Sequence, residues 1–365
     1  MMKKLLIIGA FVGINIISYA QEDNTVNGSA VDQATMDSLG LVNPKILETY
    51  NQGVKFLNAG KNIEAIQKFT EVILMDENNV QANYNRGVAH HNLGKFDDAI
   101  KDLKKTTQID PSNGMAFYMM GQAYNGKQNY EEAVKVYKKA YTADPTLEKA
   151  AYYEGVSYFQ MEDYESAIKA FDKAISIKSD YAYAYNDRGS SKLKLEDIDG
   201  AIADYKYAIN IDKGLSFAYN NLASAYRKKG DYTTADKYYT SAIKQKPDNH
   251  VAYNNRGTAR FESGNYTGAL ADFKKAITIK PDYAFAYNNK ASVYIKLEQY
   301  KEAITACNKA LELYPEYMEA FFNRGIAKEM LKDLKGACAD WEDAFILGSE
   351  NAEKYINSPA CTSSN

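Results

Sequence analysis

A period of 34 residues runs through most of this chain and constrains its fold more than any other feature. Small residues recur at this spacing without insertion or deletion: Gly53, Gly87, Gly121, Gly155, Gly189, Ala223, Gly257, Ala291 and Gly325. An alanine follows 12 residues after each of them: Ala65, Ala99, Ala133, Ala167, Ala201, Ala235, Ala269, Ala303 and Ala337. Nine repeats of 34 residues therefore fill residues 46–351. In such an array each repeat is one supersecondary unit, and neighbouring repeats bury each other's apolar faces.

Each repeat is predicted to form two helices joined by a short turn. Apolar residues recur at steps of three and four in two blocks, which is the pattern of amphipathic helices. In the turn Lys229-Gly230-Asp231-Tyr232 the glycine can close the first helix. Prolines end several second helices, because proline cannot continue the helical ladder: Pro111, Pro145, Pro247, Pro281 and Pro315. We expect the recurring small residue to face the alanine of the second helix, so that the two backbones approach closely.

Large residues fill the space between the two helices of a repeat. They account for part of an unusual composition, 31 Tyr against one Trp. They are Phe69, Tyr137, Phe171, Tyr205, Tyr239, Phe273 and Trp341.

These recurring positions resemble the tetratricopeptide repeat (TPR) family, and the resemblance covers about 306 of the 365 residues. It implies an all-α fold, a right-handed superhelical solenoid of nine helix-turn-helix units. It further implies that the first helices line a concave face, whose groove binds other proteins or peptides.

The two ends of the chain differ from the repeats. Residues 1–20 carry basic Lys3 and Lys4, an apolar run and the small-residue end Ser18-Tyr19-Ala20, which is the order of a secretory signal peptide. The alternative is a membrane anchor, but the run is short for a bilayer span. We expect residues 21–45 to be a flexible linker and residues 352–365 to cap the last repeat. The mature chain would then be a bacterial periplasmic or secreted protein without a membrane span.

Composition and motifs exclude several classes of function. The 44 basic and 47 acidic residues give a net charge of −3, which argues against a nucleic-acid partner. The sequence contains no phosphate-binding loop, zinc-protease motif or nucleophile elbow. We therefore expect no enzyme activity, no cofactor and no metal site, and a monomeric chain.

The three cysteines allow one disulfide. In an oxidising compartment Cys338 on the last repeat can bond to Cys361 after the capping segment, which would contribute about 3 kcal/mol. Cys307 would stay a free thiol, and the alternative is that all three remain thiols.

The candidate binding residues lie on the first helices. One set stands two positions before the recurring small residue: Asn51, Asn85, Asn221, Asn255, Asn289 and Asn323. Their amides could pair with the backbone of a bound peptide, although asparagine is also common here in the family. Repeats 3 and 4 carry a possible apolar contact patch instead, for which intra-repeat packing is the alternative: Tyr118, Met119, Tyr152 and Tyr153. Further groove positions are Tyr183, Phe217 and Phe285.

The function predicted from these features is a non-enzymatic protein–protein interaction scaffold of the bacterial cell envelope. A peptide or partner domain would lie in the groove, along repeats 5–8. Replacing Asn221, Asn255 and Asn289 would then weaken binding and leave stability almost unchanged. The alternative is glycan or peptidoglycan binding through exposed groove tyrosines.

Overall fold

The computed structural model describes residues 44–362, which form helices and turns without a β-strand. The predicted signal peptide and nearly all of the predicted linker lie outside these residues. The first helices of the nine repeats are α2 (Pro44–Asn58), α4 (Val80–Asn92), α6 (Gly114–Gly126), α8 (Glu148–Gln160), α10 (Ala182–Lys194), α12 (Ser216–Lys228), α14 (His250–Glu262), α16 (Ala284–Lys296) and α18 (Met318–Met330). The second helices are α3 (Asn62–Met75), α5 (Phe96–Ile109), α7 (Tyr130–Ala143), α9 (Tyr164–Ile177), α11 (Ile198–Ile211), α13 (Tyr232–Gln245), α15 (Tyr266–Ile279), α17 (Tyr300–Leu313) and α19 (Leu334–Ile346). The predicted all-α array of nine helix pairs is therefore confirmed.

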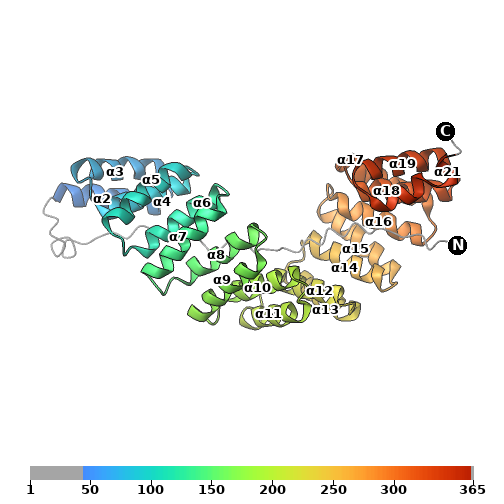
Figure 1. Cartoon of the computed structure of the whole chain (residues 1–365), viewed down its shortest axis with the longest axis horizontal. Coiled ribbons are helices and arrows are strands. Elements are labelled where there is room, and N and C mark those ends of the chain that lie inside the picture. The colour runs from blue at the N-terminus through green and yellow to red at the C-terminus, as the bar shows by residue number, and fades with distance from the viewer. Residues whose placement is uncertain (1–43, 363–365) are drawn as a thin grey trace. The chain divides into compact units, whose positions relative to one another are not determined.

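The described residues divide into two compact bodies, 44–197 and 198–362, with the division between the two helices of repeat 5. Figure 1 shows the N-terminal body in blue to green and the C-terminal body in green to red. Within each body every helix packs against the next one along the chain. The first helices of successive repeats also touch one another, as α4 touches α6 and α14 touches α16, whereas successive second helices make no comparable contact. The first helices therefore lie on the narrower, concave side of each body.

In most repeats the recurring small residue makes room for the large side chain of the second helix, a contact that the prediction, which named only the facing alanine, did not include. A Cβ atom added at Gly121 would lie 2.4 Å from Cε1 of Tyr137, and one at Gly325 would lie 2.5 Å from Nε1 of Trp341. Such distances are too short for a real Cβ, so the ring rests directly on the backbone of the first helix. Tyr137 is completely buried, and the equivalent rings of six other repeats are at most 1% exposed, so these rings lie at the centre of their repeat cores.

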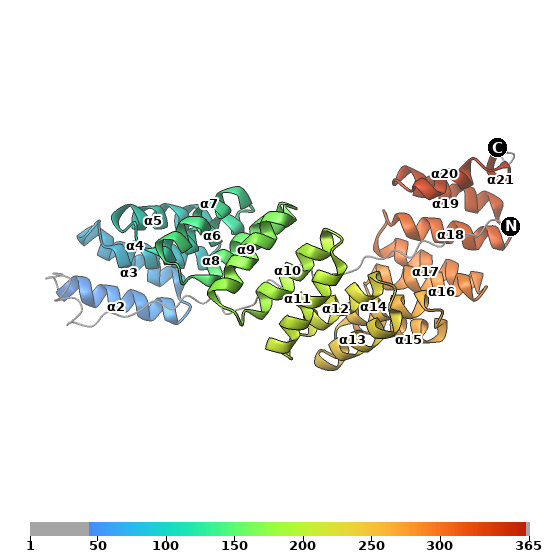
Figure 2. The ribbon, with the colours of Figure 1, turned by 60° about the horizontal axis from the view of Figure 1, so that its bottom comes forward.

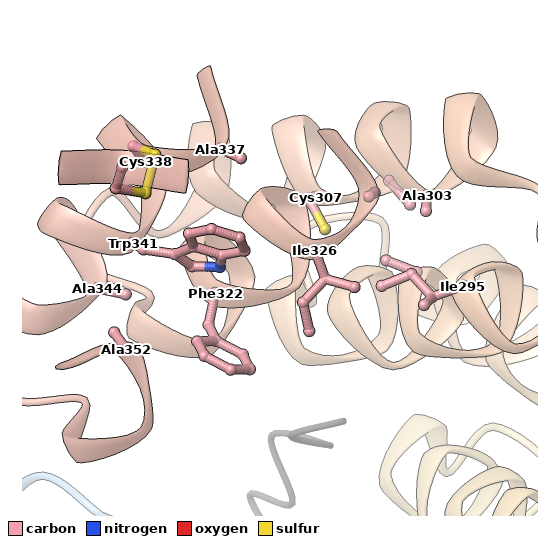
Figure 3. Close-up of a cluster of buried hydrophobic side chains, with 14 residues drawn as sticks. Ile295, Ala303, Cys307, Phe322, Ile326, Ala337, Cys338, Trp341, Ala344 and Ala352 are labelled. Carbon is pink, nitrogen blue, oxygen red and sulfur yellow. A yellow bond between two sulfur atoms is a disulfide. The ribbon is translucent and has the colours of Figure 1, made fainter. Parts of the chain in front are cut away.

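Two short helices, α20 (Glu350–Ile356) and α21 (Pro359–Thr362), follow the last repeat and pack against α19 (Figure 2). The Tyr355 ring of α20 lies 4.5 Å from the Trp341 ring and 5.3 Å from the Phe322 ring, measured between centroids. Figure 3 shows Trp341 and Phe322 side by side in this cluster. Helices α20 and α21 therefore cover the apolar face of the last repeat.

A disulfide joins this end to the last repeat. Cys338 of α19 is bonded to Cys361 of α21, with their Cα atoms 5.6 Å apart, which is the pairing predicted from the sequence (Figure 3). Cys307 is the free cysteine of the described residues. Burial raises the pKa of its thiol to about 12, so this thiol is protonated and unreactive at neutral pH.

Candidate functional site: a concave pocket in repeats 2–4

The predicted asparagine ladder exists, but it joins the repeats to one another. The side-chain amide of Asn289 donates to Oδ1 of Asn254 at 3.0 Å, and the donor and acceptor are 35 residues apart. The same bond joins Asn323 to Asn288 at 2.9 Å and Asn255 to Asn220 at 3.3 Å. Asn85 donates instead to the Tyr50 hydroxyl at 2.8 Å.

Burial contradicts the predicted role of these amides in ligand binding. Five of the six are buried, and only Asn51 is half-exposed: Asn85, Asn221, Asn255, Asn289 and Asn323 are at most 3% exposed. Asn85, Asn255, Asn289 and Asn323 each lie one residue further along their repeat than their partner in the preceding repeat, so they point into the seam between the two first helices. Because these amides are buried, we expect their replacement to lower stability, contrary to the expectation from the sequence.

The aromatic patch predicted in repeats 3 and 4 occupies the same seams. Tyr118, Met119, Tyr152 and Tyr153 are at most 4% exposed. The Tyr118 and Tyr153 rings lie 6.0 Å apart, and the Tyr152 hydroxyl donates to Asp187 at 2.7 Å. Packing therefore claims these side chains, and three of the tyrosines that the glycan alternative required are not available for stacking on a sugar.

The remaining predicted groove residues keep part of their surface. Tyr183, Phe217 and Phe285 are half-buried at the second position of their helices. The Phe285 ring lies 5.5 Å from the Tyr283 ring and 5.3 Å from the Tyr317 ring. It is thus held within an aromatic cluster of repeats 7 and 8.

The sequence analysis missed a second recurring network, which consists of Arg–Asp ion pairs between helices. Arg256, one residue before the recurring small residue, donates from Nε and Nη2 to both carboxylate oxygens of Asp272 at 2.9 and 2.7 Å. Its Nη1 reaches Thr240 on the preceding second helix at 2.9 Å. The same pairs, 16 residues apart, join Arg86 to Asp102 and Arg324 to Asp340. The recurrence of Arg and Asp at this spacing was the available signal, and in these three repeats the network links the first helix to two second helices.

A pocket of about 570 Å³ opens among the first helices of repeats 2–4. Helices α4, α6 and α8 form most of its wall, and the first residues of α5 and α7 form its rim. Its lining consists of His91, Asn92, Gly94, Phe96, Gln122, Asn125, Gly126, Tyr130, Tyr153 and Val156. Of the predicted site residues it contains only Tyr153, and it lies in repeats 2–4 and not in repeats 5–8, where the ligand was expected.

The polar groups of the pocket are held in place by the surrounding rings and hydroxyls. Asn125 donates to the Tyr137 hydroxyl at 3.1 Å and accepts from Ser157 at 2.9 Å. Gln122 donates from Nε2 to the Tyr118 hydroxyl at 3.0 Å. No hydrogen bond to the side-chain carbonyl oxygen of Gln122, Oε1, is found among the described residues. That carbonyl can therefore accept a hydrogen bond from a ligand.

His91 adds no charge to this lining at neutral pH. Its ring packs edge-on against Phe96, with the centroids 5.5 Å apart. Burial lowers the pKa of His91, and hydrogen bonding to Asn92 and to the Gln122 backbone offsets this only in part. The pocket is consequently uncharged and combines aromatic, amide and imidazole groups.

Comparison among the repeats shows that this pocket departs from the common pattern. The position of Gln122 carries a short or β-branched residue in the other eight repeats: Val54, Val88, Val156, Ser190, Ser224, Thr258, Ser292 and Ile326. The position of Gly126 carries a side chain in all of them: Asn58, Asn92, Gln160, Lys194, Lys228, Glu262, Lys296 and Met330. Sequence reasoning missed the site because it followed residues that recur, and these two occur once.

Four family models match the chain, together over more than half of its length. Models described as tetratricopeptide repeat match residues 80–113, 116–147, 220–284 and 284–317, and one described as TPR repeat matches residues 155–196. The chain belongs to the tetratricopeptide repeat family. TPR proteins typically serve as non-enzymatic scaffolds that bind other proteins, and none of the described helices of this TPR protein is long and apolar enough to cross a membrane.

Two solved structures with TM-scores above 0.5 share the fold. The APC/C hetero-tetramer Cut9–Hcn1 aligns over 90% of this chain and 80% of that chain, with 16% identity and a TM-score of 0.55. A tetratricopeptide repeat protein from Parabacteroides merdae aligns over 69% and 99%, with 17% identity and a TM-score of 0.52. MamA aligns over 44% and 94%, with 30% identity and a TM-score of 0.42. No curated protein matches the sequence.

Proposed function

We propose that this TPR protein is an exported scaffold that holds an extended segment of a partner protein in the pocket of repeats 2–4. The pocket itself is the observation that carries the proposal. Its volume of about 570 Å³ falls within the range of ligand sites, about 300–1,000 Å³. Its mixture of apolar rings and amide groups suits a peptide, which presents side chains and backbone N–H and C=O groups together.

Gln122 and Gly126 depart from the pattern of the other repeats, which favours a role in binding over a role in the fold. The other repeats form the same helix pairs with a short residue at the position of Gln122 and a side chain at the position of Gly126. The fold thus requires neither of these two residues. Repeat 3 has exchanged both within one turn of α6, on the concave side and beside the exposed Asn92.

Export is supported by two independent features. The signal-like sequence of residues 1–20 ends in small residues before Gln21. The disulfide between Cys338 and Cys361 is stable in oxidising compartments and rare in the cytosol. Both features are expected of a protein that works in the bacterial envelope or outside the cell.

Two measurements test the proposal. Fractionation of the native cells, with N-terminal sequencing of the protein, should find it in the periplasmic or secreted fraction and beginning at Gln21. Recovery of the intact chain from the cytosol would contradict export. For binding, partners retained by the wild-type protein should be lost from the Gln122→Val variant, which carries the residue of repeats 2 and 4. Equal retention would place binding elsewhere.

A further inference from the structure

The concave side of repeat 3 lacks a side chain that the other repeats carry at the end of their first helices. Gly126 ends α6, and a Cβ atom there would lie 2.4 Å from Cζ of the Phe96 ring. The equivalent residues Asn92 and Gln160 carry side chains. Because Gly126 has none, the Phe96 ring packs directly on the backbone at the end of α6, and both residues line the pocket.

The charge of the lining residues limits which ligands can enter the pocket. None of the ten lining residues is an Asp, Glu, Lys or Arg. An ionised group of a ligand would lose hydration there without gaining a counter-charge, which is costly. An uncharged ligand loses much less on entering.

The shape and chemistry of the wall define the complementary group. The partly exposed rings of Phe96 and Tyr130 provide apolar surface, against which a large apolar side chain gains the free energy of burial. The Gln122 carbonyl provides an acceptor beside that surface, and an amide group can pair with a peptide backbone.

From these observations we propose that the pocket selects an uncharged segment of a partner polypeptide that inserts one large apolar side chain against the Phe96 ring, and that Gly126 sets the room for that side chain because it lets the Phe96 ring pack on the backbone of α6. This proposal rests on the proposed function and specifies its ligand. Neighbouring first helices lie about 10 Å apart and an extended chain advances about 3.4 Å per residue. A segment of about seven residues therefore spans repeats 2–4.

A random heptapeptide library displayed on phage tests this proposal. The library is selected on the whole immobilised chain with its disulfide intact. Two variants report on the pocket. Gly126→Asn gives repeat 3 the residue of repeat 2 and forces the Phe96 ring to move. Gln122→Val gives it the residue of repeats 2 and 4. Gln160→Asn, at the equivalent position in repeat 4 and outside the pocket lining, is the matched control. Circular dichroism of each variant verifies that the helices are retained.

We expect enriched peptides with one conserved Phe, Tyr, Leu, Ile or Met and uncharged flanking residues. Calorimetric titration of the synthetic peptides should show at least tenfold weaker binding to Gly126→Asn, weaker binding to Gln122→Val, and unchanged binding to Gln160→Asn.

Two other results overturn the proposal and can be told apart. Peptides that depend on Gly126 but share a conserved Asp, Glu, Lys or Arg would refute the uncharged ligand and leave the proposed function standing. Peptides that bind all variants equally, or the absence of any enrichment, would refute the pocket as a peptide site and the proposed function with it.

Discussion

The bond between Asn289 and Asn254 allows a quantitative test of the inter-repeat ladder. Both residues are 1% exposed, and their hydrogen bond measures 3.0 Å. In Asn289→Ala the buried Oδ1 of Asn254 loses its donor, and an unsatisfied buried acceptor costs about 1–3 kcal/mol. Part of this cost is offset, because the buried Oδ1 of Asn289 has no partner among the described residues and is removed as well. We therefore expect a destabilisation of about 1–2 kcal/mol.

The effect should be local, because stability in a repeat array depends on neighbouring interfaces. Hydrogen exchange measured by mass spectrometry should show faster exchange in peptides from α14 to α16 and little change in α4 to α8. Asn254→Ala and the double variant complete a cycle whose coupling energy should lie between about 0.5 and 3 kcal/mol. Asn210→Ala, at an exposed position of α11, is the control and should change exchange only slightly. Strictly additive single effects would show that the ladder bond contributes nothing, and the account of the seams would fail.

Three further outcomes are expected. Gly325→Ala places a methyl group 2.5 Å from the Trp341 indole nitrogen and should lower stability by about 1–3 kcal/mol in urea titration; an unchanged midpoint would contradict the packing of the ring on the backbone. Cys361→Ser removes the disulfide to Cys338 and should cost about 2–4 kcal/mol, seen as faster exchange in α20; equal protection would mean that the disulfide does not hold the cap. Because burial lowers the pKa of His91 in the folded chain, the unfolded chain protonates first as pH falls below about 6.5, so stability should fall on acidification. His91→Leu should reduce that slope in melting experiments at pH 5 to 7, and an identical slope would exclude His91 as its source.

The fold could be predicted because every repeat carries the same sequence pattern for a pair of helices. The exact 34-residue spacing defines each helix pair, and a chance departure in one repeat leaves eight others in agreement. The cap and the cysteine pair could be predicted for a related reason, since the last apolar face of an array needs a cover and only one cysteine lies on the segment that follows it.

The binding residues could not be predicted in the same way. Recurrence identifies residues that the fold needs, so Asn255 and Asn289 recur because they join one repeat to the next. The spacing of residues along a first helix does not tell whether an amide faces the groove or the seam between repeats. A groove-facing position and a seam-facing position are neighbours on that helix. Gln122 and Gly126 are informative through their departure from the pattern, and only the structure shows that both departures open onto the same space.

Site-specific photo-crosslinking in the native cells tests the central claim most directly. A photoreactive phenylalanine at Asn92, an exposed residue of the pocket wall, should form a crosslink to a partner polypeptide, and Gly126→Asn in the same chain should abolish that crosslink. The same group at Lys169, an exposed residue of α9 outside the pocket, is the control and should give none. Crosslinks of equal yield from both positions, or a crosslink from Asn92 that Gly126→Asn leaves unchanged, would contradict the assignment of the pocket in repeats 2–4 as the binding site.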